Sequence, residues 1–233
     1  MKKSTKLLIE IVLGVVIVGL AVWLYVSIME PVKFDNEYNK RRAACAEKLK
    51  VIRTLEEAYK TTYTTFCGDF DTLLNRLMNE DSMRVVSKIV NTDRIPADVD
   101  INEMTEFDAI KKGYITRTDI YINPIKKLRE EGKLNITRPD GSVSALTDEE
   151  LLNICKVPYP KDKDYKFTLA ARTIDKGGLI VPVFECKVDL KDLLSDLDHQ
   201  LVVNKIAELD RIGRYPGWKV GDLEQSITDG NFE

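Results

Sequence analysis

The longest hydrophobic feature of the chain is a run without charge near its start. Residues 11–28 read IVLGVVIVGLAVWLYVSI, and with the apolar residues just before them they can cross a hydrocarbon core of roughly 30 Å as a helix. A cleaved signal peptide has a shorter apolar stretch that closes at a small-residue site, whereas this run closes with YVSIMEP. We therefore predict one uncleaved transmembrane helix over 7–29, because no later run is long enough to form a second.

The flanks of this run predict its orientation. Trp23 and Tyr25 lie near its far end, and three lysines precede it: Lys2, Lys3 and Lys6. Lysines are enriched on the cytoplasmic side of a span and aromatic residues at its interfaces. This predicts a cytoplasmic tail over 1–6 and an exported domain over 30–233.

Composition narrows the classes of partner that the exported domain could bind. The net charge is −3 and the lysines dominate the first residues, so the exported domain is acidic. An acidic domain argues against nucleic acid as a partner and against docking onto anionic lipid headgroups.

Two features of the membrane segment bear on contacts inside the bilayer. Gly14 and Gly19 are small residues suited to helix contact, although they are not spaced as GxxxG. Glu10 stands near the start of the run. Either it lies near the headgroups, favoured by the helix dipole, or it pairs with a partner's charge inside the membrane, where an unpaired charge is expensive.

A second pattern predicts a long amphipathic helix over 35–65, after Pro31 has ended or kinked the membrane helix. Apolar residues recur there at spacings of three and four, and Glu56 interrupts them at one position. The main members of this stripe are Leu49, Ile52, Leu55, Tyr59 and Tyr63. The stripe fits a coiled-coil seam or, as we favour, a face that packs on the sheet of its own domain.

The rest of the domain mixes short helices with strands. Capping residues predict helices that begin at Asp69, Thr105, Thr147 and Asp198. Runs rich in Val, Ile and aromatic residues predict strands over 83–90, 114–122, 165–174 and 179–190, the last two as a hairpin. The last helix is expected to face the core with five apolar side chains: Leu201, Val202, Ile206, Leu209 and Ile212. We predict an α+β fold: an N-terminal transmembrane helix, a long amphipathic helix packed on an antiparallel sheet, and additional short helices.

Candidate chemistry is sparse. Four cysteines in an oxidising compartment allow three pairings, of which Cys155–Cys186 is the plausible one; buried free thiols are the equal alternative. Cys45 and Cys67 are expected on one helix and too far apart to bond. His199 is the only histidine and is expected at a solvated helix start. We predict no catalytic residue, no cofactor and no metal.

The order of these pieces resembles the plan of type IV pilins and type II secretion pseudopilins. The resemblance rests on Ile52-Arg-Thr-Leu-Glu-Glu-Ala-Tyr59, on the aromatic residues Tyr63 and Phe66, and on the short helix that begins at Phe70. It implies leader cleavage before Lys6 and a role for Glu10 as the fifth mature residue, which neutralises a neighbouring subunit's amino terminus. The segment RYPGWKVG over 214–221 resembles a family of uncharacterised single-span bacterial envelope proteins. These resemblances imply a location in a bacterial inner membrane, with the main domain in the periplasm.

These features predict a non-enzymatic, membrane-anchored, pseudopilin-like subunit of an envelope-spanning secretion or pilus-like assembly. Its expected partners are the lipid bilayer and other membrane or periplasmic subunits, including further copies of itself. The alternative is a tethered periplasmic binding or assembly-platform domain that contacts partner proteins. A membrane-anchored hydrolase is the lesser alternative, since the chain has no P-loop, GxSxG or HExxH motif.

Overall fold

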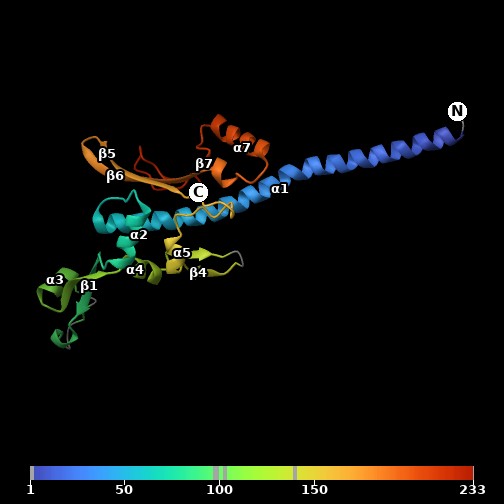
Figure 1. The fold of residues 1–233 in the computed structure, drawn as a ribbon. Helices are drawn as coiled ribbons and strands as arrows, with labels where there is room; N and C mark the ends of the chain where they lie inside the picture. The colour runs from blue at the N-terminus through green and yellow to red at the C-terminus, as the bar shows by residue number, and fades with distance from the viewer. Residues whose placement is uncertain (1–2, 97–99, 102–103, 139–140, 233) are drawn as a thin grey trace.

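One helix organises the whole molecule. A computed structural model describes residues 3–96, 100–101, 104–138 and 141–232, with side chains from Ile11 onward. Helix α1 runs without interruption over Lys3–Tyr63, a length of 61 residues. It projects from the rest of the chain at its N-terminal end and lies within the domain at its other end (Figure 1).

The expectation that Pro31 ends this helix is wrong. Helix α1 continues through Pro31, although a proline there removes one backbone hydrogen bond and costs about 3 kcal/mol. Two aromatic side chains of the next turns, Phe34 and Tyr38, are buried at 8% exposure each. Burying such side chains contributes roughly 1.5–3 kcal/mol apiece, and this packing offsets the loss.

Helix α1 ends at Tyr63, and the following Thr64 takes a left-handed conformation with φ of 64°. Cys67 therefore lies outside the helix that carries Cys45, contrary to expectation. The chain then turns into α2 (Phe70–Asn79), whose N-cap is the expected Asp69. Its side chain accepts a hydrogen bond from the Thr72 backbone N–H.

The other elements follow in a mixed order. The helices are α3 (Glu106–Lys111), α4 (Pro124–Glu130), α5 (Asp148–Leu152), α6 (Leu190–Leu193) and α7 (His199–Arg211), with a short 3₁₀ turn over Thr92–Arg94. The strands are β1 (Met83–Val90), β2 (Ile115–Ile122), β3 (Asn135–Thr137), β4 (Val143–Ala145), β5 (Thr168–Lys176), β6 (Leu179–Asp189) and β7 (Gly217–Gly221). The predicted caps at Thr105, Thr147 and Asp198 are present.

These strands form three antiparallel sheets, in the orders β1-β2, β3-β4 and β5-β6-β7. The sheet β5-β6-β7 lies with α7 on one side of α1, and the elements from β1 to α5 lie on the other (Figure 1). The chain is therefore α+β, with a long apolar N-terminal helix and antiparallel sheets, as predicted.

The core packs α1 against the sheet β5-β6-β7 and also includes buried side chains of α2, α4 and α5. On α1, Leu49, Ile52 and Leu55 are fully buried. Strand β6 meets them with a buried inner face that includes Phe184, Cys186 and Val188. Tyr59 is 6% exposed and Tyr63 packs on the core while partly exposed. The α1 stripe is thus covered by its own domain.

Some local expectations are corrected. Ile212 was expected inward but is 59% exposed, because it caps the C-terminal end of α7, past the turns that pack. Leu190 was assigned to a strand, but β6 ends at Asp189 and Leu190 begins α6. Strand β5 begins at Thr168, later than predicted.

Candidate functional site

The apolar end of α1 has no partner within the described chain. Its side chains from Ile11 to Ile28 are exposed, from 49% for Val16 to 69% for Trp23, and Tyr25 is 64% exposed. A side chain at Gly14 or Gly19 would meet no atom within 4 Å. The mean hydropathy reaches 2.7 over this part of the helix, which fits a membrane span or signal anchor. The Glu10 side chain lies outside the described residues.

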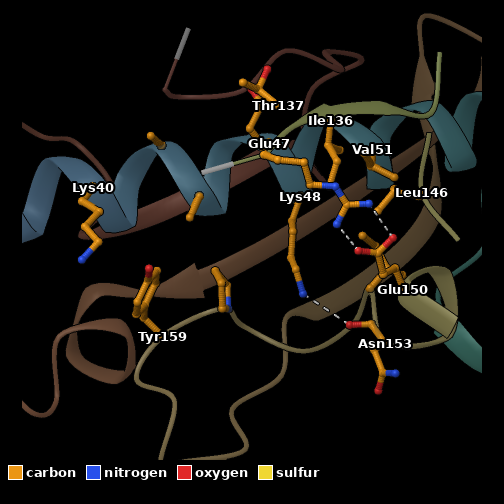
Figure 2. A pocket seen from close by; sticks show the side chains of 15 residues that line it. Lys40, Glu47, Lys48, Val51, Ile136, Thr137, Leu146, Glu150, Asn153 and Tyr159 are labelled. Carbon is orange, nitrogen blue, oxygen red and sulfur yellow. Dashed lines mark hydrogen bonds and ion pairs between the residues drawn. The ribbon is translucent and has the colours of Figure 1, made fainter. Parts of the chain in front are cut away.

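A groove lies beside α1 on the side of the β3-β4 hairpin (Figure 2). Three segments wall it: α1 from Lys40 to Val51, strand β3, and the chain after α5 from Asn153 to Tyr159. Its volume is about 610 Å³, within the usual range for small-ligand pockets. Its apolar lining includes Ala44, Val51, Ile136, Leu146, Ile154 and Pro158.

Two polar side chains of the groove, Arg138 and Glu150, form an ion pair with each other. Arg138 donates two hydrogen bonds to the Glu150 carboxylate, one of them 3.0 Å long, and this contact lowers the pKa of Glu150 to about 2. Glu150 also completes the capping box of α5 with Thr147. The ion pair therefore braces β3 against α5 and holds the wall of the groove.

Lys48 lies between these groups and Tyr159 (Figure 2). Its ammonium donates to two backbone carbonyls at the end of α5, that of Lys156 at 2.7 Å and that of Asn153 at 3.4 Å. No described carboxylate lies within ion-pair distance of its Nζ. Burial lowers the pKa of Lys48, so this is a partly desolvated cation.

A buried cation lies beside the groove residue Tyr159, near the end of the groove closest to the apolar half of α1. Arg41 is 5% exposed. It donates at 2.8 Å to the Asp196 carboxylate and at 2.9 Å to the Leu193 carbonyl. Its guanidinium also lies 5.2 Å from the centre of the Tyr159 ring. This contact fixes α6 and the Tyr159 loop to α1.

A buried carboxyl group lies deeper in the core. Glu56, which interrupts the apolar stripe, is fully buried. Its Oε2 accepts a hydrogen bond of 2.9 Å from the Cys67 backbone N–H, and its Oε1 has no hydrogen-bond partner among the described residues. Burial raises the pKa of Glu56 to about 8, so the group is mostly protonated at neutral pH. The stripe position was the one sequence signal for its burial.

The four cysteines are free thiols, so the predicted Cys155–Cys186 disulfide is not formed. Strand pairing explains this: Cys186 faces Leu169 across the sheet, whereas the Cys155 carbonyl accepts from the Phe167 N–H. Burial raises the pKa of Cys45 to about 12 and raises that of Cys186 well above its usual value. Neither buried thiol is poised as a nucleophile.

The remaining candidates are occupied by structural roles. His199 is exposed at the first position of α7. Among the acidic residues near it, Asp198 caps α7, Asp196 binds Arg41, and Asp189 accepts from the Tyr215 hydroxyl. Among the described residues, no group of three or more His, Cys, Asp or Glu side chains is arranged to hold a metal ion.

Comparison with known proteins adds no relative: no family model, no curated protein and no solved structure matches the chain. The helix-and-groove geometry is therefore the basis for a functional proposal.

Proposed function

We propose that this chain is a non-enzymatic, membrane-anchored subunit of an envelope-spanning assembly of the pseudopilin kind. In this proposal residues 7–29 cross a bacterial inner membrane and residues 30–233 lie in the periplasm. The observation that carries it is the continuity of α1, which is at once the apolar segment and the central helix of the domain.

Continuity matters because it fixes the domain relative to the apolar segment. A domain that only needs to be kept near a membrane is commonly joined by a flexible linker rich in Gly, Ser or Pro. Here the first buried side chain, Phe34, comes within two turns of the last residue of the apolar run, Ile28, on the same helix. A rigid connection suits subunits that must pack side by side in a defined orientation.

The apolar segment also offers a surface to partners. All its described side chains are exposed, and Gly14 and Gly19 leave open space around the backbone. Small residues allow neighbouring helices to approach closely within a bilayer. The supported partners are lipid and other membrane subunits, including copies of this chain.

A flexible insertion tests the role of continuity. We expect Gly-Ser-Gly-Ser inserted after Glu30 to leave the domain folded and membrane-bound but to abolish the complexes captured by chemical cross-linking in native membranes. The matched control is the same insertion in the exposed β5–β6 turn, after Gly177, which should retain the complexes. Complexes that survive the first insertion would favour a tethered binding domain instead.

A reporter fusion tests the topology independently. A periplasm-dependent enzyme fused after Glu233 should be active, because the lysines near the N-terminus favour a cytoplasmic start. Activity of a cytoplasm-dependent reporter at the same position would overturn the proposal, whatever the cross-linking shows.

A further inference from the structure

The groove beside α1 exists because the helix presents its smallest side chains there. Ala43 and Ala44 form the middle of the helical wall, and each lies one turn from a longer residue on either side. On one row of the helix surface the order is Lys40, Ala44, Lys48, since residues four apart lie one above the other. The hollow is therefore flanked by lysines at both ends of this row.

The chemistry of the hollow is that of an aliphatic ligand site. The walls beside Ala44 are Val51, Ile136, Leu146 and Ile154, none of which offers a hydrogen bond from its side chain. Such a surface recovers free energy only when apolar atoms replace water over it. An aliphatic chain meets this need, whereas a peptide backbone would require partners for its amide groups.

The charged side chains of the groove indicate which polar head group an aliphatic ligand would carry. Lys40 is paired with Glu37 at 3.1 Å, and the groove residue Glu47 is paired with Lys50 at 3.3 Å. The guanidinium of Arg138 is held by Glu150. Lys48 is the groove cation with no described carboxylate within ion-pair distance, and its ammonium donates to two backbone carbonyls. A ligand carboxylate at this position would accept a charge-assisted hydrogen bond from it.

The groove also shares its helix with the proposed membrane span. Ala44 lies on the same continuous helix as Ile28, about 24 Å along its axis at 1.5 Å per residue. From these observations we propose that the groove between α1, β3 and the Asn153–Tyr159 segment binds a long-chain fatty carboxylate, with its chain over Ala44 and its head at Lys48. This inference rests on the membrane span of the proposed function but not on its assembly role, because the site needs neither a partner subunit nor helix contacts in the bilayer.

Photolabelling of the full chain in isolated membranes tests the site. The probe is a palmitic acid analogue with a diazirine in its chain and a terminal alkyne, and labelled peptides are mapped by mass spectrometry. We expect labels in two places, the groove segments and the apolar residues 11–28, which face lipid and report delivery of the probe.

Two variants separate the contributions. Ala44→Leu fills the hollow and should reduce groove labelling at least tenfold while labelling of residues 11–28 stays unchanged. Its matched control is Ala207→Leu, at an exposed position of helix α7. Lys48→Met should reduce groove labelling about tenfold, but should not reduce labelling by the corresponding fatty alcohol. Its control is Lys176→Met, at the exposed last position of β5.

The opposing outcomes are equally definite. Groove labelling that Ala44→Leu does not change, or labels confined to residues 11–28, would overturn the proposal. Equal loss of the acid and alcohol probes in Lys48→Met would overturn the assignment of Lys48 to the head group. Since Ala44 is partly exposed and contributes only a methyl group, its variant keeps the test decisive even if Lys48→Met loosens α5.

Discussion

Helix α1 contains two halves that differ in what covers their apolar side chains. In the apolar half, Ile11–Ile28, apolar side chains cover every face of the helix and remain exposed. In the packing half, Phe34–Tyr63, apolar side chains occupy one face and are buried by the sheet β5-β6-β7 and its neighbours, while the other faces carry charge.

The difference shows which part of the helix finds its packing partners within its own chain. The packing half has its partners within the domain, so its stability is a property of the folded chain. The apolar half has none among the described residues, and a helix that is apolar all round is stable in solution only when something else covers it. One continuous helix thus joins a segment whose apolar side chains need lipid or another protein to cover them to a segment whose apolar side chains are covered by its own domain.

The largest test of this comparison removes the same kind of side chain from each half. Leu55→Ala deletes a fully buried side chain of the packing half and should lower the free energy of unfolding by about 2–5 kcal/mol, including the cavity left behind. Val16→Ala deletes an exposed side chain of the apolar half and should leave domain unfolding unchanged. Denaturant unfolding of the full chain in mild detergent, followed by near-UV circular dichroism, measures both.

The concentration dependence of that result separates packing from self-association. If the stripe is covered within the domain, the loss caused by Leu55→Ala is the same at every protein concentration. An effect that disappears on dilution, with a matching loss of self-association in sedimentation, would instead identify the stripe as a coiled-coil seam.

The comparison also explains what the sequence could predict. The stripe at Leu49 and Ile52 and the caps at Asp69 and Thr147 are local signals, since each depends on spacing within one or two turns. Pro31 misled because its local cost is offset by packing beyond it. The groove was not foreseen, because it arises where Ala44 meets Ile136 and Ile154 from distant parts of the chain.

Glu56 was visible as an interruption of the stripe but not as a buried acid. Its burial depends on the Cys67 backbone N–H, which reaches it only because α1 ends at Tyr63 and the chain turns back. Sequence periodicity describes one helix face and cannot supply that returning loop.

The second test asks whether Glu56, a buried acidic residue of the packing half, is uncharged in the folded chain. The folded-state pKa of Glu56 is raised to about 8, above the roughly 4.3 of an unfolded glutamate. Folding therefore favours the protonated form. The contribution of Glu56 to the free energy of unfolding should be highest below pH 4.3, fall as the pH rises towards 8 by up to about 1.4 kcal/mol per pH unit, and level off above it.

Glu56→Gln removes this titration while retaining an oxygen for the Cys67 N–H. It should stabilise the domain by about 2–4 kcal/mol at pH 8.5 and have little effect at pH 4. Glu57→Gln, at an exposed neighbouring position, is the control. A variant with the same pH profile as the wild type would mean that Glu56 is ionised in the folded core.

The smallest expected effect lies at the junction of the two halves. Pro31 is exposed and precedes the first buried side chain, Phe34. Pro31→Ala restores a backbone N–H and a better helix former, but the segment is helical before and after the change. Because Pro31 lies only three residues past Ile28, we expect this turn to stay helical with the detergent-bound apolar half when the domain unfolds. The gain then cancels, and the free energy of domain unfolding should shift by less than about 0.5 kcal/mol. Spin labels at Leu24→Cys and Asn39→Cys, in a Cys155→Ser background, measure the rod itself: a continuous helix places these positions about 22 Å apart along the axis, with Pro31 or with Ala. If the distance between the labels lengthens, or its distribution narrows, only in Pro31→Ala, then the proline uncouples the two halves. The connection between the apolar half and the domain would then not be rigid.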